Sequence, residues 1–543
     1  MIPLPDLLHD RPHAAADERF LVELLEMAFL GSNESRGIDE GFGRIPLPRP
    51  TWNPDFFVND LFLEGFLANL STLVIDGRDY PIHTAFVLRV LSQPPVDLQS
   101  ILFRQAILRE LEADQAICSR VTTLYTELVA LLDQLKSTHT HTLLDTTSLR
   151  LDTLRHLHRV VDYMASEFGE AQSGLRRLHD VGIEIQASHE HETLSALLDY
   201  EDNHTRLDLR IRVGADGRIR NLEIEGLCDN EDNRFYLSPW RRWAEMMRLR
   251  WRGTTFTQRE LVNRVILDVY RRIAPAFSTL VQLLGHLEVY MVTRAFAAEA
   301  HKAGLEVCLA DVERGSAIAL RDLFNPLLLQ TQGPPIPATI TPVSDEAVTV
   351  VTGPNSGGKT RLLQALGLAQ LLGQSGLYVP AAEARLPLSR SMFASLVHQD
   401  GADLQEGRLG TELLRIRTLF LGVEPGAMIL IDELCSGTNP SEAAEIISMV
   451  LRLLRKLSPH AFITTHFLDI AKNLEDEPPI GDLEFLQVEI DGEQSSTYQF
   501  VSGVATTSLA VGTARRLGVD FERLAAAIDE RTGSGSGPAD REL

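Results

Sequence analysis

A glycine-rich octet containing one lysine and one threonine carries the strongest chemical signal in the sequence. It reads Gly353-Pro354-Asn355-Ser356-Gly357-Gly358-Lys359-Thr360 and has the spacing G-x-x-x-x-G-K-[ST]. The backbone N–H groups of such a loop close around phosphates, the lysine reaches the outer phosphates, and the threonine hydroxyl ligates Mg²⁺. We therefore expect these eight residues to bind a nucleoside triphosphate, with Lys359 on the phosphates and Thr360 on the metal.

Two carboxylates follow an apolar run about seventy residues after this loop. Asp432 and Glu433 come directly after residues 427–431. We expect Asp432 to hold Mg²⁺ through water and Glu433 to orient or deprotonate the attacking water. His466 follows a further apolar run and is a candidate sensor of the γ-phosphate; the alternative is an ordinary histidine at the end of a strand. Gln399 is a candidate contact of Mg²⁺ or water, with a purely structural role equally open.

The elements around these residues predict how they are positioned. Residues 347–352, 427–431 and 461–464 are apolar runs typical of buried strands, and residues 362–372 have the pattern of an amphipathic helix. A phosphate-binding loop between a strand and a helix belongs to an α/β nucleotide-binding domain.

Upstream of this domain the pattern is mostly helical. Residues 98–198 contain no proline, and alternating apolar residues at 205–228 predict a β-hairpin. A later apolar stripe runs from Val262 to Met291 in steps of three and four, which predicts a helix some 40 residues long with one buried face and a kink at Pro275. The fold class is thus a multidomain α plus α/β protein, with a helical core, a small β insertion and a P-loop α/β domain. The expected boundaries are 1–97 for a mixed lead-in, 98–304 for the helical core with an insertion at about 203–230, 305–508 for the ATPase domain, 509–530 for a helical segment and 531–543 for a disordered tail.

Composition excludes several classes of protein. The 543 residues have a net charge of −24, which counts against nonspecific adhesion to nucleic acid but not against a local basic groove. No apolar run is long enough to span a bilayer, and no secretory signal is visible at the N-terminus, so we expect a cytoplasmic protein with no membrane contact. The four cysteines stand far apart, without zinc or redox spacing.

The order of these parts resembles the MutS family of ABC-type ATPases. The resemblance is specific over about residues 256–525 and architectural over 98–255. It implies a homodimer that uses ATP and Mg²⁺, a clamp in the β insertion, a lever in the long helix and a dimerisation segment at about 509–527. The residues that carry it are Thr352–Thr360, Tyr378-Val379-Pro380-Ala381, Ile431-Asp432-Glu433, Ser436-Gly437-Thr438, Thr465-His466-Phe467 and Gly503-Val504-Ala505-Thr506-Thr507-Ser508.

Two departures from the family pattern stand out. The segment expected to complete the partner's ATP site, residues 406–415, lacks the family's usual serine, and the backbone of Gly407 or Gly410 would have to replace it. The mismatch-reading domain and the Smr tail of longer members are not recognised, which indicates a short member that clamps DNA without probing a mismatch directly.

Further candidates come from the resemblance and from charge. Tyr498 lies where the family stacks a ring on adenine, with Ile336 opposite; ordinary packing is the alternative. Basic residues near the β insertion are candidate DNA contacts, with a solvated helix face equally open. These are Arg210, Arg212, Arg241, Arg242 and Arg248. The pairs His139/His141 and His189/His191 lack the i, i+4 spacing of a helical zinc site, which favours solvated turns.

The predicted function is ATP-dependent binding of mismatched, distorted or branched DNA by a dimeric clamp, in DNA repair or recombination, with other repair proteins as partners. Three alternatives remain: an ATP-gated scaffold that binds proteins instead of DNA, a structural-maintenance ATPase, and a protein that binds ATP but scarcely hydrolyses it. The second requires an intact serine-glycine signature and a long coiled coil, and neither is seen in the sequence.

Overall fold

The chain forms two compact units. The helical unit comprises Met1–Arg49, Pro81–Val90 and Gln99–Met291, and the sheet unit comprises Pro50–Tyr80, Leu91–Leu98 and Val292–Leu543. Residues 1–97, expected as one lead-in domain, are thus divided between the units. The structure is a computed structural model that describes residues 4–12, 18–30, 41–45, 47–48, 51–137, 146–202, 205–213, 219–229, 258–331, 333–344, 346–354, 357–396, 407–491, 495–506, 518–519 and 521–532.

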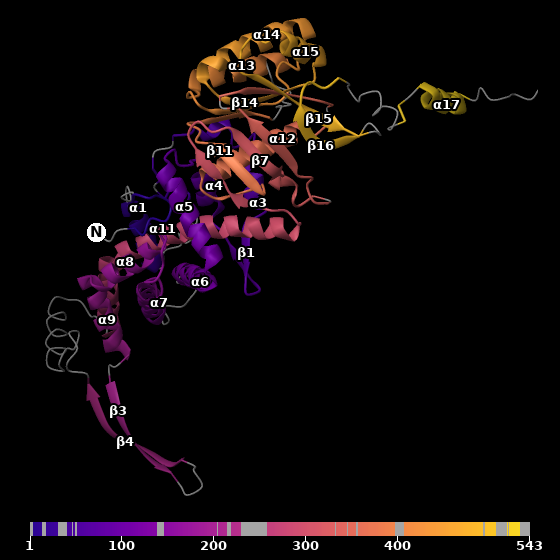
Figure 1. The fold of residues 1–543 in the computed structure, drawn as a ribbon. Helices are drawn as coiled ribbons and strands as arrows, with labels where there is room; N and C mark the ends of the chain where they lie inside the picture. Colours follow the sequence, from indigo (N-terminus) through magenta and orange to yellow (C-terminus); the bar gives the residue numbers. More distant parts are fainter. Residues whose placement is uncertain are drawn as a thin grey trace, which may run out of the picture. The chain divides into compact units, whose positions relative to one another are not determined.

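The sheet unit is built on a six-stranded sheet in the order β12-β13-β14-β9-β15-β16 (Figure 1). Every pair is parallel except β15 with the edge strand β16. The central strands β9, β13 and β14 are buried along their whole length, because helices cover both faces of a parallel sheet. The strands are β9 (Val348–Thr352), β12 (Met392–Ser395), β13 (Met428–Ile431), β14 (His460–Thr465), β15 (Leu483–Ile490) and β16 (Ser496–Ser502).

Helices of the sheet unit supply its hydrophobic core. Ile416 of α13, Ile447 of α14 and Ile470 of α15 share one buried cluster with the apolar side chains of β13 and β14. On α12, Gly367 allows close packing, since a Cβ there would lie 2.8 Å from Leu430 Cδ1 of β13. The helices are α3 (Leu63–Ala68), α12 (Lys359–Gln374), α13 (Gly407–Gly422), α14 (Pro440–Leu454), α15 (Leu468–Asp476) and α17 (Phe521–Thr532).

A second, four-stranded sheet in the order β6-β11-β7-β8 also belongs to the sheet unit. Its strand β7 pairs antiparallel with both β11 and β8. Two further pairs, β1 with β2 and β5 with β10, form separate two-stranded sheets. The bounds are β1 (Thr72–Ile75), β2 (Arg78–Pro81), β5 (Cys308–Leu309), β6 (Asp311–Glu313), β7 (Ile318–Leu323), β8 (Ala338–Val343), β10 (Tyr378–Val379) and β11 (Glu383–Pro387).

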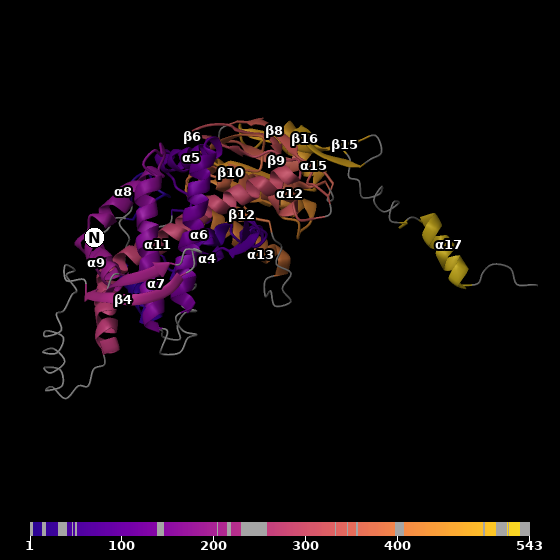
Figure 2. The same cartoon turned by 90° about the horizontal axis from the view of Figure 1, so that it is seen from below.

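The helical unit packs long helices against one another (Figures 1 and 2). Helix α7 contacts α6, α8 and α9, and leucines of α6 face Phe277 and Leu284 of α11 around a cavity of about 10 Å³. No described helix is both long enough and apolar enough to cross a membrane. The helices are α1 (Glu18–Leu30), α4 (Thr84–Leu91), α5 (Leu98–Ala113), α6 (Gln115–Ser137), α7 (Thr146–Glu167), α8 (Arg176–Gln186), α9 (His189–Asp202) and α11 (Gln258–Lys302).

Helix α11 is the long helix expected from the apolar stripe. It has 45 residues and continues through Pro275. The expectation of a single buried face is wrong for its middle part, because every residue from 276 to 293 is buried. One buried acid there is paired: the fully buried Glu288 accepts hydrogen bonds from Nδ1 of His83 at 2.7 Å and from its backbone N–H at 3.0 Å. Burial of a charged side chain is costly unless it is hydrogen-bonded, and His83 supplies these bonds to Glu288.

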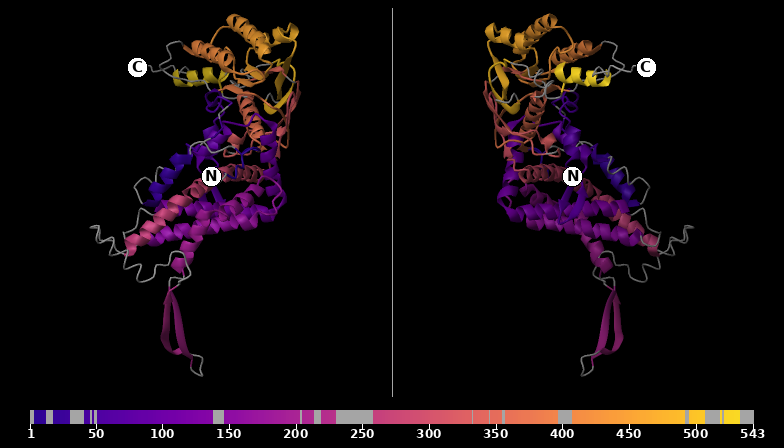
Figure 3. Two further views of the ribbon diagram at one scale, coloured as in Figure 1. Left: turned by 90° about the vertical axis from the view of Figure 1, so that its left-hand side faces the viewer. Right: turned by 90° about the vertical axis from the view of Figure 1, so that its right-hand side faces the viewer.

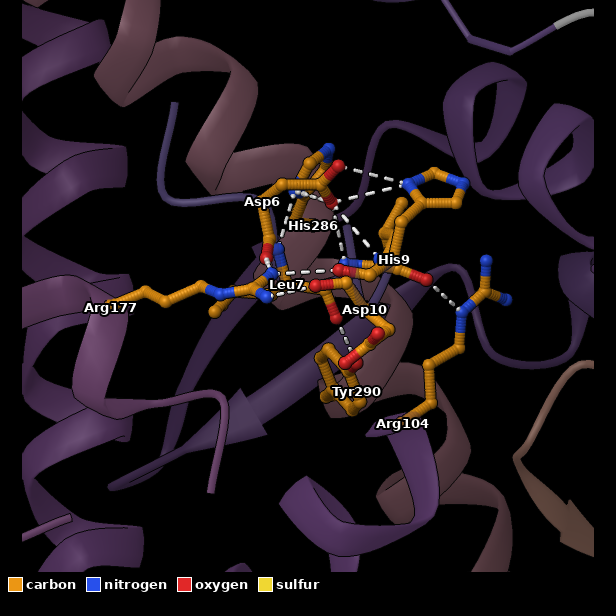
Figure 4. A network of polar contacts seen from close by, with 9 residues as sticks. Asp6, Leu7, His9, Asp10, Arg104, Arg177, His286 and Tyr290 are labelled. Carbon is orange, nitrogen blue, oxygen red and sulfur yellow. Dashed lines mark hydrogen bonds and ion pairs between the residues drawn. The ribbon is translucent and has the colours of Figure 1, made fainter. Parts of the chain in front are cut away.

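The N-terminal segment is fixed to α11 and α5 by hydrogen bonds to its backbone (Figure 4). The Leu7 N–H donates to His286 Nδ1 at 3.3 Å, and the hydroxyl of Tyr290 donates to the Leu7 carbonyl. The Arg104 guanidinium donates to the Leu8 carbonyl at 2.7 Å. Burial lowers the pKa of His286 to about 4. The ring is therefore neutral, which leaves Nδ1 free to accept the bond from Leu7.

Asp6 anchors the same segment through its carboxylate. It accepts bonds from the Leu8 N–H at 2.8 Å and from His9 Nδ1 at 3.0 Å, while its carbonyl accepts from Arg177 at 2.5 Å. Burial raises the pKa of Asp6, but the hydrogen bond from His9 and the neighbouring histidines outweigh burial and hold this pKa below its usual value. A charged carboxylate thus stabilises the turn that docks the N-terminal segment.

Two other expectations concern the helical unit. The predicted β-hairpin is present as β3 (Thr205–Val213) and β4 (Ile219–Asp229), which form an antiparallel pair (Figure 3). The register of the pair shifts at two places. The solvated turn expected at His189–Glu192 is wrong: these residues begin α9, and His191 is only 5% exposed. Packing of α9 on α7 buries this histidine. His139 and His141 lie outside the described residues.

Candidate functional site

The glycine-rich loop joins β9 to α12, as the sequence predicts. Gly353 has φ +142° and lies so close to β15 that a Cβ would be 2.7 Å from Val488 Cγ2. Gly358, with φ +84°, precedes the first residue of α12. Both positions favour glycine, because residues that have a Cβ rarely adopt these positive φ angles. Asn355 and Ser356 lie outside the described residues.

Lys359 is the first residue of α12 and is buried inside the loop. Its Nζ donates to the carbonyls of Gly353 at 2.8 Å and Pro354 at 2.9 Å, and the residue is 4% exposed. Burial lowers the pKa of Lys359, and the carboxylates of Glu433 and Asp432 oppose that shift by favouring the charged form. The ammonium is therefore held at the loop with two acids close by.

The metal-ligand candidates Thr360 and Asp432 meet directly. Thr360 Oγ1 donates to Asp432 Oδ2 at 2.5 Å, although the two residues are 72 positions apart. Asp432 follows β13 and is 7% exposed. Hydroxyl and carboxylate oxygens are ligands that Mg²⁺ prefers in nucleotide sites. These two side chains therefore fit a Mg²⁺ ion at the strand ends.

Thr464 orders both acidic residues, a role that the sequence patterns did not single out. Its Oγ1 donates to Asp432 Oδ1 at 2.6 Å and accepts a bond from the Glu433 N–H at 2.8 Å. Because Ile431 pairs with Ile463 on the neighbouring strand, the residues that follow are brought side by side. The sequence signal that could have identified Thr464 is its position as a polar residue within an apolar run. The residue is fully buried in β14.

Glu433 and His466 follow the ends of neighbouring strands. Glu433 has φ +51°, an uncommon conformation for a residue with a side chain and one typical of functional sites. His466 Nδ1 is buried without a hydrogen-bond partner among the described residues, and its ring lies 4.2 Å from that of Phe467. A buried ring nitrogen without a partner is available to a ligand.

A cavity of about 280 Å³ lies beside the loop and brings Tyr498 and Ile336 together. Tyr498 has φ +59° and lies against the loop: a Cβ on Gly358 would be 3.0 Å from its Cδ1. The neighbouring Gln499 amide donates to the Pro337 carbonyl at 2.9 Å, which connects β16 to the other wall. The other lining residues are Leu323, Asn325, Leu328, Thr331, Gly333, Pro334, Pro335, Ala338, Arg361, Leu362, Ala365 and Phe500.

The segment after β16 returns to the base of the loop. The Ala505 N–H donates to Thr352 Oγ1 at 2.9 Å, and that hydroxyl lies 3.2 Å from the Leu486 carbonyl. Thr352 is the last residue of β9 and is fully buried. Residues 503–506 are thereby tied to the strand that carries the phosphate loop, while residues 507–508 lie outside the described residues.

The segment expected to complete a partner's site begins α13. Gly407 and Gly410 lie in the first turn of that helix. Arg415, further along, donates to the Ala394 carbonyl at 2.7 Å and pairs with Asp60. Asp60 in turn accepts from the Leu396 N–H at 2.7 Å, so Asp60 connects the middle of α13 to the residue that follows β12. Gln399 lies outside the described residues.

The candidate DNA contacts are described only in part. Arg210 and Arg212 belong to β3, where they pair in register with Glu223 and Asn221 of β4. The three arginines at 241, 242 and 248 lie outside the described residues.

Comparison with known proteins places this site in a family context. A model of MutS domain V matches residues 349–531. A protein of Ligilactobacillus salivarius named Endonuclease MutS2 is 28% identical over 277 residues, which are 50% of this chain and 34% of that protein. A protein of the same name from Thermomicrobium roseum is 25% identical over 435 residues, 74% of this chain and 51% of that protein. A third, from Streptococcus agalactiae, is 31% identical over 240 residues, 44% of this chain and 29% of that protein. The chain thus spans between about a third and a half of the length of these relatives.

Proposed function

The chain belongs to the MutS family, and we propose that it is a Mg²⁺-dependent ATPase whose ATP cycle controls a dimeric clamp on distorted or branched DNA. The observation that carries the proposal is the convergence of Lys359, Thr360 and Asp432 at the end of a parallel sheet, with Thr360 Oγ1 2.5 Å from Asp432 Oδ2. Ligands of open α/β sheets bind at this edge, beyond the carboxyl ends of the strands.

Each residue of the site has one task in the proposed hydrolysis. The loop N–H groups and Lys359 bind the phosphates, and Thr360 with Asp432 holds Mg²⁺, which supplies charge neutralisation at the phosphates. Glu433 orients the attacking water and accepts its proton, and His466 contacts the γ-phosphate through its available Nδ1. Thr464 positions Asp432 and Glu433 through its two hydrogen bonds.

The cavity beside the loop is the proposed adenine site. Its volume of about 280 Å³ is close to that of small-ligand pockets. Tyr498 is 41% exposed there and offers a ring face, and Ile336 offers an apolar contact across the cavity. Because Gly358 belongs to both the cavity and the phosphate loop, a base bound here would lie next to its own phosphates.

A homodimer is the proposed assembly. Helix α17 carries Phe521 at 88% exposure and Leu524 at 47%, three residues apart and therefore on one face. Exposed aromatic and aliphatic side chains on one helix face are typical of protein–protein contacts. In this dimer the start of α13, with Gly407 and Gly410, faces the partner's nucleotide.

DNA is the proposed partner of the β3–β4 hairpin and of the arginines at 241, 242 and 248. Arginines bind the phosphate backbone independently of sequence, which suits recognition of DNA shape. Helix α11 contributes residues to both units and is the proposed lever between nucleotide and DNA. The same proposal expects the protein in the cytoplasm with its DNA and with other repair proteins.

The decisive experiment measures ATP hydrolysis and DNA binding together. We expect Mg²⁺-dependent ATPase activity, and tighter binding to mismatched or four-way-junction DNA than to plain duplex, with affinity that changes with ATP and falls with salt. Equal affinity for all DNA substrates would overturn the DNA part, and absence of nucleotide binding would overturn the whole. Because the relatives are named endonucleases, the same reactions are analysed for cleaved strands.

A further inference from the structure

Two histidines and an aspartate on helices α7 and α9 lie together, away from the nucleotide-site residues in sequence. His158 and Asp162 are four residues apart on α7 and therefore share a face, and His191 comes from the first turn of α9. One ligand atom from each residue lies within 4.8 Å of the other two. A tetrahedral zinc ion, with bonds of about 2.0 Å, holds its ligand atoms about 3.3 Å apart. Small side-chain rotations would therefore close this cluster around an ion.

The buried ring of His191 supplies the independent observation. The residue is 5% exposed, and its Nε2 has no hydrogen-bond partner among the described residues. A buried polar atom without a partner is rare and calls for a ligand or ion. The ring stacks on that of His158 with centroids 4.6 Å apart. The unsatisfied nitrogen therefore belongs to a ring that contacts another member of the cluster.

The other two side chains already have the outer partners that metal ligands require. His158 Nδ1 lies 2.8 Å from Asp162 Oδ2, and its Nε2 lies 2.9 Å from Ser195 Oγ. The second carboxylate oxygen, Asp162 Oδ1, accepts from the Gln186 amide at 2.7 Å. Metal-binding histidines and carboxylates are oriented by such second hydrogen bonds. With Nδ1 and Oδ2 on the ion, Ser195 and Gln186 would hold both ligands in place.

We propose that His158, Asp162 and His191 form a binding site for a divalent transition-metal ion of the zinc class. Two imidazoles and one carboxylate are a common donor set for such ions, with a fourth position left for water. Since α9 ends at Asp202 and β3 begins at Thr205, the ion would tie α7 to the helix that leads into the hairpin. The ion would therefore be a structural link between α7 and the first turn of α9, the end of that helix remote from the hairpin.

Hydrolysis by the same residues is excluded by their backbone. The line Asp162–His158–Ser195 has the order of a catalytic triad, but Ser195 lies inside α9. The N–H groups around it are bonded within the helix and offer no oxyanion donors. Metal binding fits the cluster and its unsatisfied His191 Nε2, and nucleophilic catalysis does not.

The test uses the full-length protein, stripped of metal by chelation and titrated with Zn²⁺ and Co²⁺ without nucleotide. We expect one ion per chain, a Co²⁺ absorption typical of low coordination, and a rise in melting temperature with Zn²⁺. Asp162→Asn and His191→Gln should each weaken binding at least tenfold. Asp162 is 45% exposed, so its variant folds even where the His191 variant does not.

His189→Gln is the matched control. This residue lies on the same helix two positions from His191, is 67% exposed and pairs with Glu192, so its replacement should leave binding unchanged. Asp432→Asn removes a proposed metal ligand of the nucleotide site, so this variant shows whether the titrated ion binds there instead. Three outcomes would each overturn the proposal. They are the absence of stoichiometric metal binding, equal metal binding by the wild type and the Asp162 variant, and loss of metal binding in the Asp432 variant alone.

Discussion

Thr464 Oγ1 lies 2.6 Å from Asp432 Oδ1, and this one hydroxyl also accepts the Glu433 N–H at 2.8 Å. The threonine comes from β14 and both acids follow β13, its parallel neighbour. The buried hydroxyl of Thr464 donates one hydrogen bond and accepts another. It therefore fixes both the orientation of the Asp432 carboxylate and the position of the Glu433 backbone. The geometry of the proposed metal and water sites therefore depends on a strand that contributes no charge to them.

Replacing Thr464 by valine should remove this ordering at nearly constant volume. We expect a loss of about 1–3 kcal/mol in unfolding free energy, because two buried polar groups lose their partner. We also expect a lower kcat for ATP, with recovery in Thr464→Ser. Thr349→Val is the control: this buried hydroxyl on β9 has no hydrogen-bond partner among the described residues, so its loss should cost nothing. Denaturant titration and steady-state ATPase assays measure both effects, and equal behaviour of the two valine variants would contradict the assigned role.

Substitutions of Lys359 and Glu433 should affect ATP binding and ATP hydrolysis separately. Lys359→Ala removes the buried ammonium at the loop and should weaken ATP binding at least tenfold. Glu433→Gln keeps shape and binding but should lower kcat about 10²-fold or more, since the general base is lost. Nucleotide binding by fluorescence and turnover by phosphate release distinguish the two. An unchanged rate in the glutamine variant would remove Glu433 from catalysis.

Tyr498 should contribute to nucleotide affinity through its ring. Tyr498→Ala should weaken ATP binding about two- to tenfold, the effect of about 0.5–1.5 kcal/mol of aromatic contact, whereas Tyr498→Phe should bind normally. Because Tyr498 forms a wall of the cavity beside Gly358, kcat at saturating ATP should stay the same. Inosine triphosphate titrations test the base directly. Full affinity in the alanine variant would place the adenine elsewhere.

His286 predicts that acid loosens the N-terminal segment. Burial lowers the pKa of His286 from 6.5 to about 4. Between these two pH values His286 is protonated in the unfolded chain and neutral in the folded chain. Stability should therefore fall as pH drops from about 6.5 to about 4, by at most about 3 kcal/mol. Asp6, whose pKa is below its usual 3.8, adds a loss only at lower pH. Hydrogen exchange of residues 4–12 measures the opening, and His286→Gln, which still offers an acceptor to Leu7, should flatten this part of the profile.

The exposed face of α17 should hold two chains together. Phe521→Glu with Leu524→Glu places two charges on this face and should shift the protein from dimer to monomer in sedimentation, with a fall in ATPase activity per chain. Glu522→Gln, on the same exposed helix, is the control and should remain dimeric. A dimer that survives the double charge would place the interface on another surface.

Several features of the site were accessible from the chain alone because they depend on neighbours in sequence. The phosphate loop at residues 353–360 needs glycines at set positions, one lysine and one threonine, and its strand and helix adjoin it. Asp432 and Glu433 follow a run of apolar residues that only a buried strand explains. Local backbone geometry decides such motifs, so their residue types are visible before folding.

The tertiary structure decided what distant segments do for one another. Tyr498 and Ile336 form one cavity although they stand far apart in the chain, and Thr464 reaches two acids over 30 positions away. The spacing of His189 and His191 predicted a solvated turn, yet α9 packs on α7 and His191 is buried. Helix α11 is buried on every side in its middle part. Strand order and helix packing are set by the burial of apolar surface throughout each unit, which no local window contains.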